Sequence, residues 1–233
     1  MKTKLVYGVG INDADYVVKK WETFYVNGVR KRKLVWECPY YRAWCNMLQR
    51  CYSAKYQETH PTYKGCSVSE EWLTFSVFKS WMEVQDWECK QLDKDLIFSG
   101  NKVYSKGTCV FVTSVVNLFT TDSGAARGEC LLGVNWDKEK GKFKSRCCNP
   151  FTKKQEHLGY FTCQEEAHQA WLIRKLELAN ELAAEQTDER VAKALIERYT
   201  AYRNNGDQTP LMTVKKQVER GVQEVELNDL CTP

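Results

Sequence analysis

The chain has 233 residues, and 34 lysines and arginines face 30 aspartates and glutamates. The resulting net charge of +4 permits a nucleic-acid partner without demanding one. The longest apolar stretch, residues 110–119, is interrupted by polar residues and reaches roughly half of a bilayer span. We therefore expect no transmembrane helix and no membrane partner.

Residues 1–37 are expected to form a basic arm, either irregular or two-stranded. The arm has short runs typical of strands, such as Phe24-Tyr25-Val26, and one dense basic cluster, Arg30-Lys31-Arg32-Lys33. Such a cluster is either a solvated turn or a contact for phosphate groups, and the sequence leaves both open.

From Pro39 the apolar residues recur at steps of three and four, which predicts an amphipathic helix. Its expected buried face consists of Tyr41, Trp44, Met47, Leu48 and Cys51. A second helix is expected after Gly65, with its apolar stripe running from Trp72 to Met82.

Residues 91–122 predict a strand, a loop, a second strand and a helix. The first strand covers residues 91–96, and residues 109–119 run from a strand into a helix. Small residues in 121–128 indicate a linker.

The segment 130–186 predicts a three-stranded antiparallel sheet backed by one long helix. Strands are expected at 132–136, 142–148 and 155–161, and residues 162–165 have the pattern of a capping box that begins the helix. Another helix is expected at 188–203, within a C-terminal region of helix and tail, 187–233.

Alternation in the second of these strands matters for function. Successive side chains of a strand point to opposite faces, so Lys142, Lys144 and Arg146 are expected together on one face. This face is either ordinary solvated surface or a binding surface for an anion.

The eleven cysteines include no Cys-x-x-Cys pair, and their number is odd. This pattern favours reduced thiols in a cytoplasmic protein over a disulfide framework, and we expect no structural zinc.

A series of short motifs lies between residues 133 and 171, namely Gly133-Val134, Gly141-Lys142-Phe143, Asn149-Pro150, Leu158-Gly159-Tyr160-Phe161-Thr162 and Ala170-Trp171. In this order the motifs resemble the ethylene-response-factor (APETALA-type) DNA-binding domain of plants. In that family the sheet enters the major groove of DNA. The resemblance implies that the DNA-contacting residues here are Asn135, Lys142, Lys144, Arg146, Gln155 and His157. A structural or neutral surface role remains open for His157.

A second series of motifs lies between about residue 38 and residue 120, namely Tyr41-x-x-Trp44-x-x-Met47-x-x-Arg50-Cys51-Tyr52, Tyr63-x-Gly65-Cys66, Leu92-Asp93-Lys94-Asp95 and Gly100-Asn101-Lys102-Val103-Tyr104. This segment resembles phage homing endonucleases of the HNH type. The HNH fold is a β-hairpin and a helix around one divalent metal. The resemblance implies a domain at 38–122 in which Asp93 and Asn117 hold Mg²⁺ or Mn²⁺.

Where the family has the histidine that acts as base, this chain has Lys94. The candidate catalytic residues are therefore Asp93, Lys94 and Asp95, with Asp95 or a substrate phosphate as the alternative base. Asp93 and Asp95 can instead be turn-capping residues that pair with Lys94 and Lys102.

Together these observations predict an α+β protein, with an HNH-like ββα-metal region followed by a three-stranded sheet on one long helix. The expected partner is double-stranded DNA, and the protein is a monomer or a dimer. The expected activity is metal-dependent cutting or nicking of DNA by a phage-encoded hydrolase in the host cytoplasm. Two alternatives remain open, a DNA-binding regulator without nuclease activity and a protein-interaction module.

Overall fold

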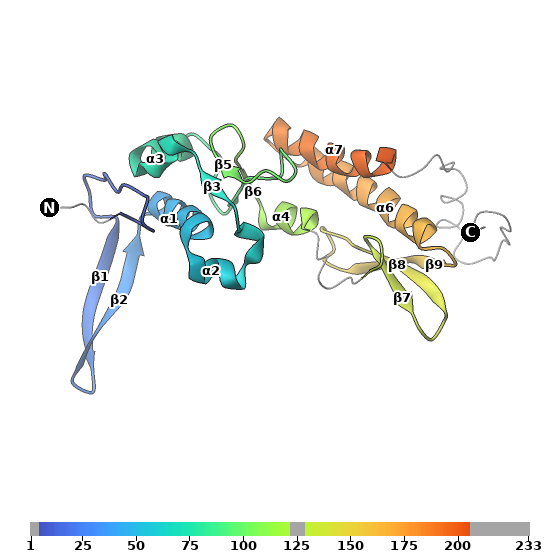
Figure 1. The fold of residues 1–233 in the computed structure, drawn as a ribbon, viewed down its shortest axis with the longest axis horizontal. Helices are drawn as coiled ribbons and strands as arrows, with labels where there is room; N and C mark the ends of the chain where they lie inside the picture. The colour runs from blue at the N-terminus through green and yellow to red at the C-terminus, as the bar shows by residue number, and fades with distance from the viewer. Residues whose placement is uncertain (1–4, 122–128, 206–233) are drawn as a thin grey trace. The chain divides into compact units, whose positions relative to one another are not determined.

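The computed structural model describes residues 5–121 and 129–205, which form a mixed α+β structure. The fold divides into two compact units between Ser114 and Val115. Figure 1 labels the helices and strands used below. Within the described ranges, no helix has the length and apolar character required to cross a membrane.

The first unit begins with an antiparallel β-hairpin and continues mainly as helix. Its hairpin consists of β1 (Lys19–Val26) and β2 (Val29–Glu37), which confirms a two-stranded arm within the first 37 residues. The helices are α1 (Pro39–Tyr52), α2 (Ala54–Thr59) and α3 (Phe75–Glu83), with single 3-10 turns at Pro61–Tyr63 and Glu70–Leu73.

Helix α1 buries the five residues that its periodicity predicts, Tyr41, Trp44, Met47, Leu48 and Cys51. They pack in an aromatic core whose largest buried members from the rest of the unit are Trp72, Phe75, Phe78 and Tyr104. The indole Nε1 of Trp44 donates to the carbonyl of Trp72 at 2.7 Å, so the buried polar group of this ring has a partner.

Two short sheets complete the first unit. One pairs β3 (Ser67–Val68) with β5 (Val103–Tyr104) in parallel, and the other pairs β4 (Gln91–Asp93) with β6 (Val110–Val112) in antiparallel orientation. Helix α4 (Ser114–Thr120) follows β6 directly along the chain. The predicted linker 121–128 lies outside the described residues except for Thr121.

The second unit contains the three-stranded antiparallel sheet that the sequence predicts, in the order β7-β8-β9. Its strands are β7 (Val134–Asp137), β8 (Lys142–Cys148) and β9 (Gln155–Phe161), so β8 and β9 have the predicted bounds. Two helices follow, α6 (Gln164–Ala184) and α7 (Glu189–Asn205).

Helix α6 packs against one face of this sheet. Val134, Phe161, Ala167 and Ala170 form the buried centre of the contact, as the apolar patterns of the strands and the helix require. The predicted capping box is wrong in its position, because the helix begins at Gln164 with Cys163, not Thr162, as its N-cap residue, and no side chain caps it there.

Candidate nucleic-acid interface

The outer face of the sheet β7-β8-β9, the face opposite α6, brings together the residues predicted to contact DNA. In β8 the side chains of Ser145 and Cys147 are buried on the helix side, while Lys142, Lys144 and Arg146 alternate with them and remain partly exposed. These three cationic side chains are therefore not buried in the core of the second unit.

The neighbouring strands add polar groups to the outer face. Asn135 of β7 pairs with Lys144, and His157 of β9 pairs with Arg146. Gln155, at the start of β9, pairs with Cys148 and is exposed. All six residues predicted from the sequence thus lie on the three strands of one sheet.

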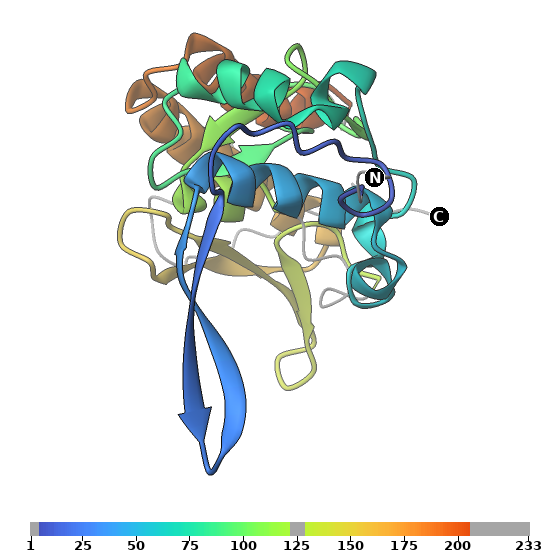
Figure 2. The ribbon, with the colours of Figure 1, turned by 90° about the vertical axis from the view of Figure 1, so that its left-hand side faces the viewer.

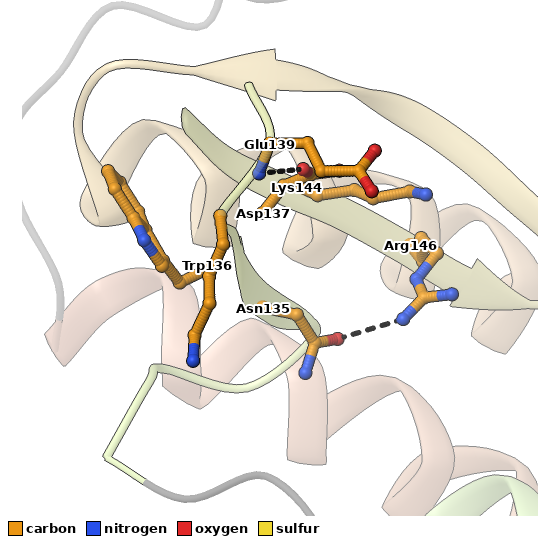
Figure 3. Close-up of a pocket in the computed structure, with 7 residues that line it drawn as sticks. Asn135, Trp136, Asp137, Glu139, Lys144 and Arg146 are labelled. Carbon is orange, nitrogen blue, oxygen red and sulfur yellow. Dashed lines mark hydrogen bonds between the residues drawn. The ribbon is translucent and has the colours of Figure 1, made fainter. Parts of the chain in front are cut away.

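Arg146 lies at the centre of this arrangement. One of its terminal nitrogens donates to Asn135 Oδ1 at 3.3 Å, and the other donates to Gln155 Oε1 at 3.2 Å. Figure 3 shows the side chains of Arg146 and Asn135 pointing toward one another from β8 and β7. The guanidinium is held across the sheet by neutral amides, which leave its charge uncompensated.

The same region contains a shallow hollow in the surface (Figure 3). It is lined by Asn135, Trp136, Asp137, Lys138, Glu139, Lys144 and Arg146. Asp137 Oδ1 accepts bonds from the backbone amides of Glu139 and Lys140, both at 3.2 Å, and so shapes the β7–β8 turn. In the described part of the chain, no carboxylate forms an ion pair with Lys142, Lys144 or Arg146.

Tyr160 also belongs to the outer face, although the sequence pattern does not predict it there. The ring of Tyr160 lies 3.9 Å from Lys140 Nζ and 5.6 Å from Lys144 Nζ, measured to the ring centroid. Its ring also contacts that of His157, with the centroids 4.7 Å apart. If side chains alternated strictly along β9 from Gln155, Tyr160 would lie on the side of the sheet that faces α6, together with Glu156.

A β-bulge explains this difference. Arg146 pairs with His157 but Ser145 pairs with Gly159, so Leu158 is an extra residue that reverses the alternation. The bulge moves Tyr160 opposite Lys144 on the outer face. The signal available in the sequence is Gly159, since an isolated glycine in a strand often marks a bulge.

His157 is exposed at this face, and its pKa lies below the usual value for histidine. Partial desolvation is the first cause, and the positive charges of Lys144, Lys140 and Arg146 act in the same direction. At neutral pH the imidazole is therefore uncharged, and it can donate one hydrogen bond and accept another.

Contacts between the sheet and α6 fix the orientation of β9. The carboxylate of Glu156 accepts from Arg174 Nε at 2.7 Å and from Asn149 Nδ2, also at 2.7 Å. Arg174 and Asn149 keep the pKa of this carboxyl below its usual value. Asn149 Oδ1 in turn accepts hydrogen bonds from the backbone amides of Phe151 and Thr152, which stabilise the β8–β9 turn.

The predicted catalytic residues Asp93, Lys94 and Asp95 lie together at the end of β4. Asp93 Oδ1 accepts hydrogen bonds from the backbone amides of Asp95, at 2.9 Å, and Leu96, at 2.7 Å. Lys94 is buried, and its Nζ donates to Asp95 Oδ2 at 3.0 Å. This is the turn-capping and ion-pairing arrangement that the sequence left open, but Lys102 is not part of it, since its Nζ donates to the carbonyl of Thr62.

The protonation of this cluster differs from that of a catalytic base. Burial is the largest single cause and lowers the pKa of Lys94, but the hydrogen bond and charge of Asp95, together with the charges of Cys66 and Asp93, more than offset it, and the net shift is upward. Lys94 therefore holds its proton at neutral pH and has no lone pair with which to accept a proton from water. Burial and the nearby charge of Asp95 raise the pKa of Asp93.

Asn117, the other predicted metal ligand, lies in α4 of the second unit. Its backbone carbonyl accepts hydrogen bonds from the hydroxyl groups of Thr120, at 3.1 Å, and Thr121, at 2.8 Å. Within the described ranges, His, Cys, Asp and Glu side chains form no group of three that could hold a metal ion.

Comparison with known proteins adds no family to this description. No protein-family model matches the chain, and neither do any curated proteins or solved structures. The resemblances to HNH nucleases and to the plant DNA-binding domain remain predictions.

Proposed function

We propose that the protein binds double-stranded DNA through the outer face of the sheet β7-β8-β9. The observation that supports this most directly is that Lys142, Lys144 and Arg146, which form no ion pair within the described ranges, lie on a surface that also carries neutral amides and a neutral imidazole. Cations supply affinity for phosphates, and amides and a guanidinium supply donors and acceptors for base edges.

Hydrogen bonds order the side chains at the centre of the outer face. The major groove of B-DNA, which is about 12 Å wide, admits a two-stranded β-ribbon. The bonds from Arg146 to Asn135 and Gln155 hold these three side chains in place before any ligand arrives, which reduces the entropy lost on binding.

The test is a salt titration of duplex binding by a triple variant, Lys142→Gln, Lys144→Gln and Arg146→Gln. Glutamine keeps an aliphatic stem and removes the charge. If the three side chains contact phosphates, the slope of log affinity against log salt should flatten by about 0.9 for each lost contact. Unchanged affinity and slope would refute the proposal.

A matched control uses lysines whose charge is already paired. Lys90, Lys106 and Lys193 form ion pairs with Asp86, Glu71 and Glu197. Changing these three to glutamine removes the same formal charge from the chain. The control should leave the slope unchanged, so an equal effect in both variants would mean that only net charge matters.

A second candidate function is metal-dependent nicking or cutting of DNA in the manner of HNH homing endonucleases. The observation that favours it is the order of elements, an antiparallel pair β4 and β6 followed directly by α4, with Asp93 ending the first strand. Asp93 and Asp95 are two carboxylates near enough for one to raise the pKa of the other. Mg²⁺ is commonly held by one or two carboxylates together with substrate phosphates, where it acts as a Lewis acid.

Plasmid nicking with Mg²⁺ or Mn²⁺ separates this candidate from a DNA-binding regulator that does not cleave. Wild type is compared with Asp93→Asn, Asp95→Asn and Asn117→Ala. Loss of nicking in the Asp93 variant, with duplex binding intact, is the expected result for a nuclease. Absence of nicking in wild type that still binds duplex DNA would identify a regulator without nuclease activity.

A further inference from the structure

The hairpin formed by β1 and β2 is exposed on both faces. Every residue from Lys20 to Trp36 is exposed except Leu34. Its tip is the Asn27-Gly28 turn, where both residues have positive φ, 51° and 75°, as the tight turn of a two-residue hairpin requires. In Figures 1 and 2 the hairpin extends away from α1 and α3 of its own unit.

The hairpin carries the whole net charge of the chain. Between residues 19 and 37 there are six basic residues and two acidic ones, which leaves 28 of each sign in the rest of the sequence. One of the two acids, Glu37, is already paired with Lys19 at 2.8 Å and with Arg42 at 2.9 Å. The basic residues are Lys19, Lys20, Arg30, Lys31, Arg32 and Lys33.

Strand pairing sorts these residues onto two faces. Trp21, Thr23 and Tyr25 share one face with Arg30, Arg32 and Leu34, and this face has no acidic residue. The guanidinium of Arg32 lies 5.2 Å from the centre of the Trp21 ring. The opposite face contains Phe24, Lys31 and Lys33 together with Glu22.

The exposed apolar rings are not explained by the packing of the first unit. The exposed fraction is 69% for Tyr25 and 47% for Trp21. A two-stranded hairpin is only marginally stable by itself, and exposed apolar groups of this kind commonly mark a surface that a partner covers. Arginines and lysines on an exposed ribbon are complementary to a polyanion that has a groove wide enough for two strands.

We propose that the β1–β2 hairpin is a second DNA-binding element, which lies along a groove of the duplex with Arg30 and Arg32 directed at the DNA. A two-stranded ribbon fits the major groove of B-DNA, and the eight residues of β1 span about 27 Å at ~3.4 Å per residue. This element is separate from the sheet β7-β8-β9, and it is tested separately.

The first experiment measures duplex binding by the full chain with Arg30, Lys31, Arg32 and Lys33 all changed to glutamine. The salt slope should fall by about 0.9 per lost phosphate contact, and affinity at moderate salt should fall about tenfold or more. The control changes Lys79, Lys90, Lys106 and Lys193, each of which pairs with a carboxylate, and should stay within about twofold of wild type. Equal losses in both variants, or no loss in the hairpin variant, would overturn the proposal.

A crosslinking experiment tests the position of the hairpin directly. A photoreactive phenylalanine analogue replaces Tyr25, and the expected result is a covalent adduct with labelled duplex DNA, while the same analogue at Val84, which is exposed at the end of α3, gives none. Duplex RNA of the same sequence should compete poorly, because its major groove is too deep and narrow for side chains to read. Preferred binding of the hairpin to duplex RNA or to anionic lipid vesicles would overturn the assignment to DNA.

The two DNA-binding proposals fail in distinguishable ways. Loss of binding only in the hairpin variant refutes the role of the sheet, and loss only in the sheet variant refutes the role of the hairpin. Thermal unfolding of the hairpin variant should match wild type, since its substituted side chains are exposed and lie outside the core.

Discussion

Lys175 of α6 is a buried cation whose titration should control the stability of the second unit. Its Nζ donates to the carbonyl of Phe119 at 2.7 Å and lies 3.4 Å from the centre of the Phe119 ring and 5.4 Å from that of Tyr199. In the described residues, no carboxylate forms an ion pair with it. Burial, the largest cause, lowers the pKa of Lys175 to about 8.

The size and sign of the effect follow from linkage. The difference between the ordinary pKa of 10.5 and the folded value of about 8 corresponds to a cost of about 3 kcal/mol for burying the charged form of Lys175. Between these two pH values the unfolded chain binds more protons than the folded one, so stability rises with pH across this window. Below pH 8 the lysine is charged in both states, and the full cost of burying the charge is present.

Replacement of Lys175 by methionine should remove this cost. Methionine has similar length and no charge, and the carbonyl of Phe119 keeps a donor, because the hydroxyl of Tyr199 also bonds to it at 3.0 Å. We expect the free energy of unfolding at pH 7 to increase by about 2 kcal/mol, somewhat below the full amount because contacts of the ammonium with aromatic rings are lost. The advantage of the variant should disappear above about pH 10.5.

The assay is urea denaturation with a thiol reductant at a series of pH values, followed by tryptophan fluorescence and far-UV circular dichroism. Cys147, whose pKa burial raises to about 11, lowers stability at high pH in both proteins, so the difference between them is the quantity to use. Lys193→Met, at an exposed position of α7, is the control and should show no such pH dependence. A difference that stays constant with pH, or a less stable Lys175→Met variant at pH 7, would refute the reasoning.

Two further predictions concern the support of the sheet. Gly133 has a φ of +76°, and a Cβ added to it would lie 2.0 Å from Trp171 Cγ. Gly133→Ala should therefore lower the free energy of unfolding, measured by chemical denaturation, by about 3 kcal/mol. The control Gly141→Ala, with a φ of +60° and open space around the added Cβ, should lower it by about 1 kcal/mol. Glu156→Gln should cost about 1 kcal/mol at pH 7 by weakening the bond to Arg174. Because the pKa of Glu156 is lowered in the folded state, this difference should shrink as the pH falls through that pKa, and a constant difference would refute it.

Local patterns in the sequence were sufficient for most of the helices and strands. The three- and four-residue steps of α1 predicted all five of its buried residues, and the alternation in β8 separated Lys144 and Arg146 from the buried Ser145 and Cys147. These predictions hold because a helix or strand that has one buried face repeats its apolar residues with the period of its own backbone.

The candidate interface was predicted in part. Alternation in β8 predicts that Lys142, Lys144 and Arg146 share one face, whereas Asn135, Gln155 and His157 were implied only by the resemblance to the plant DNA-binding domain, and all six lie on one sheet. Tyr160 was missed because a bulge adds a residue between two paired positions, and periodicity assumes that none is added.

The sequence alone determined which segments are amphipathic, where the turns fall and which cations share a strand. Only the tertiary structure decided the protonation of Lys94 and Lys175. Both are buried, yet Lys94 has the carboxylate of Asp95 beside it, and Lys175 lies among the rings of Phe119 and Tyr199. The pKa of a buried group depends on neighbours brought together by folding, and no local pattern specifies which neighbours these will be.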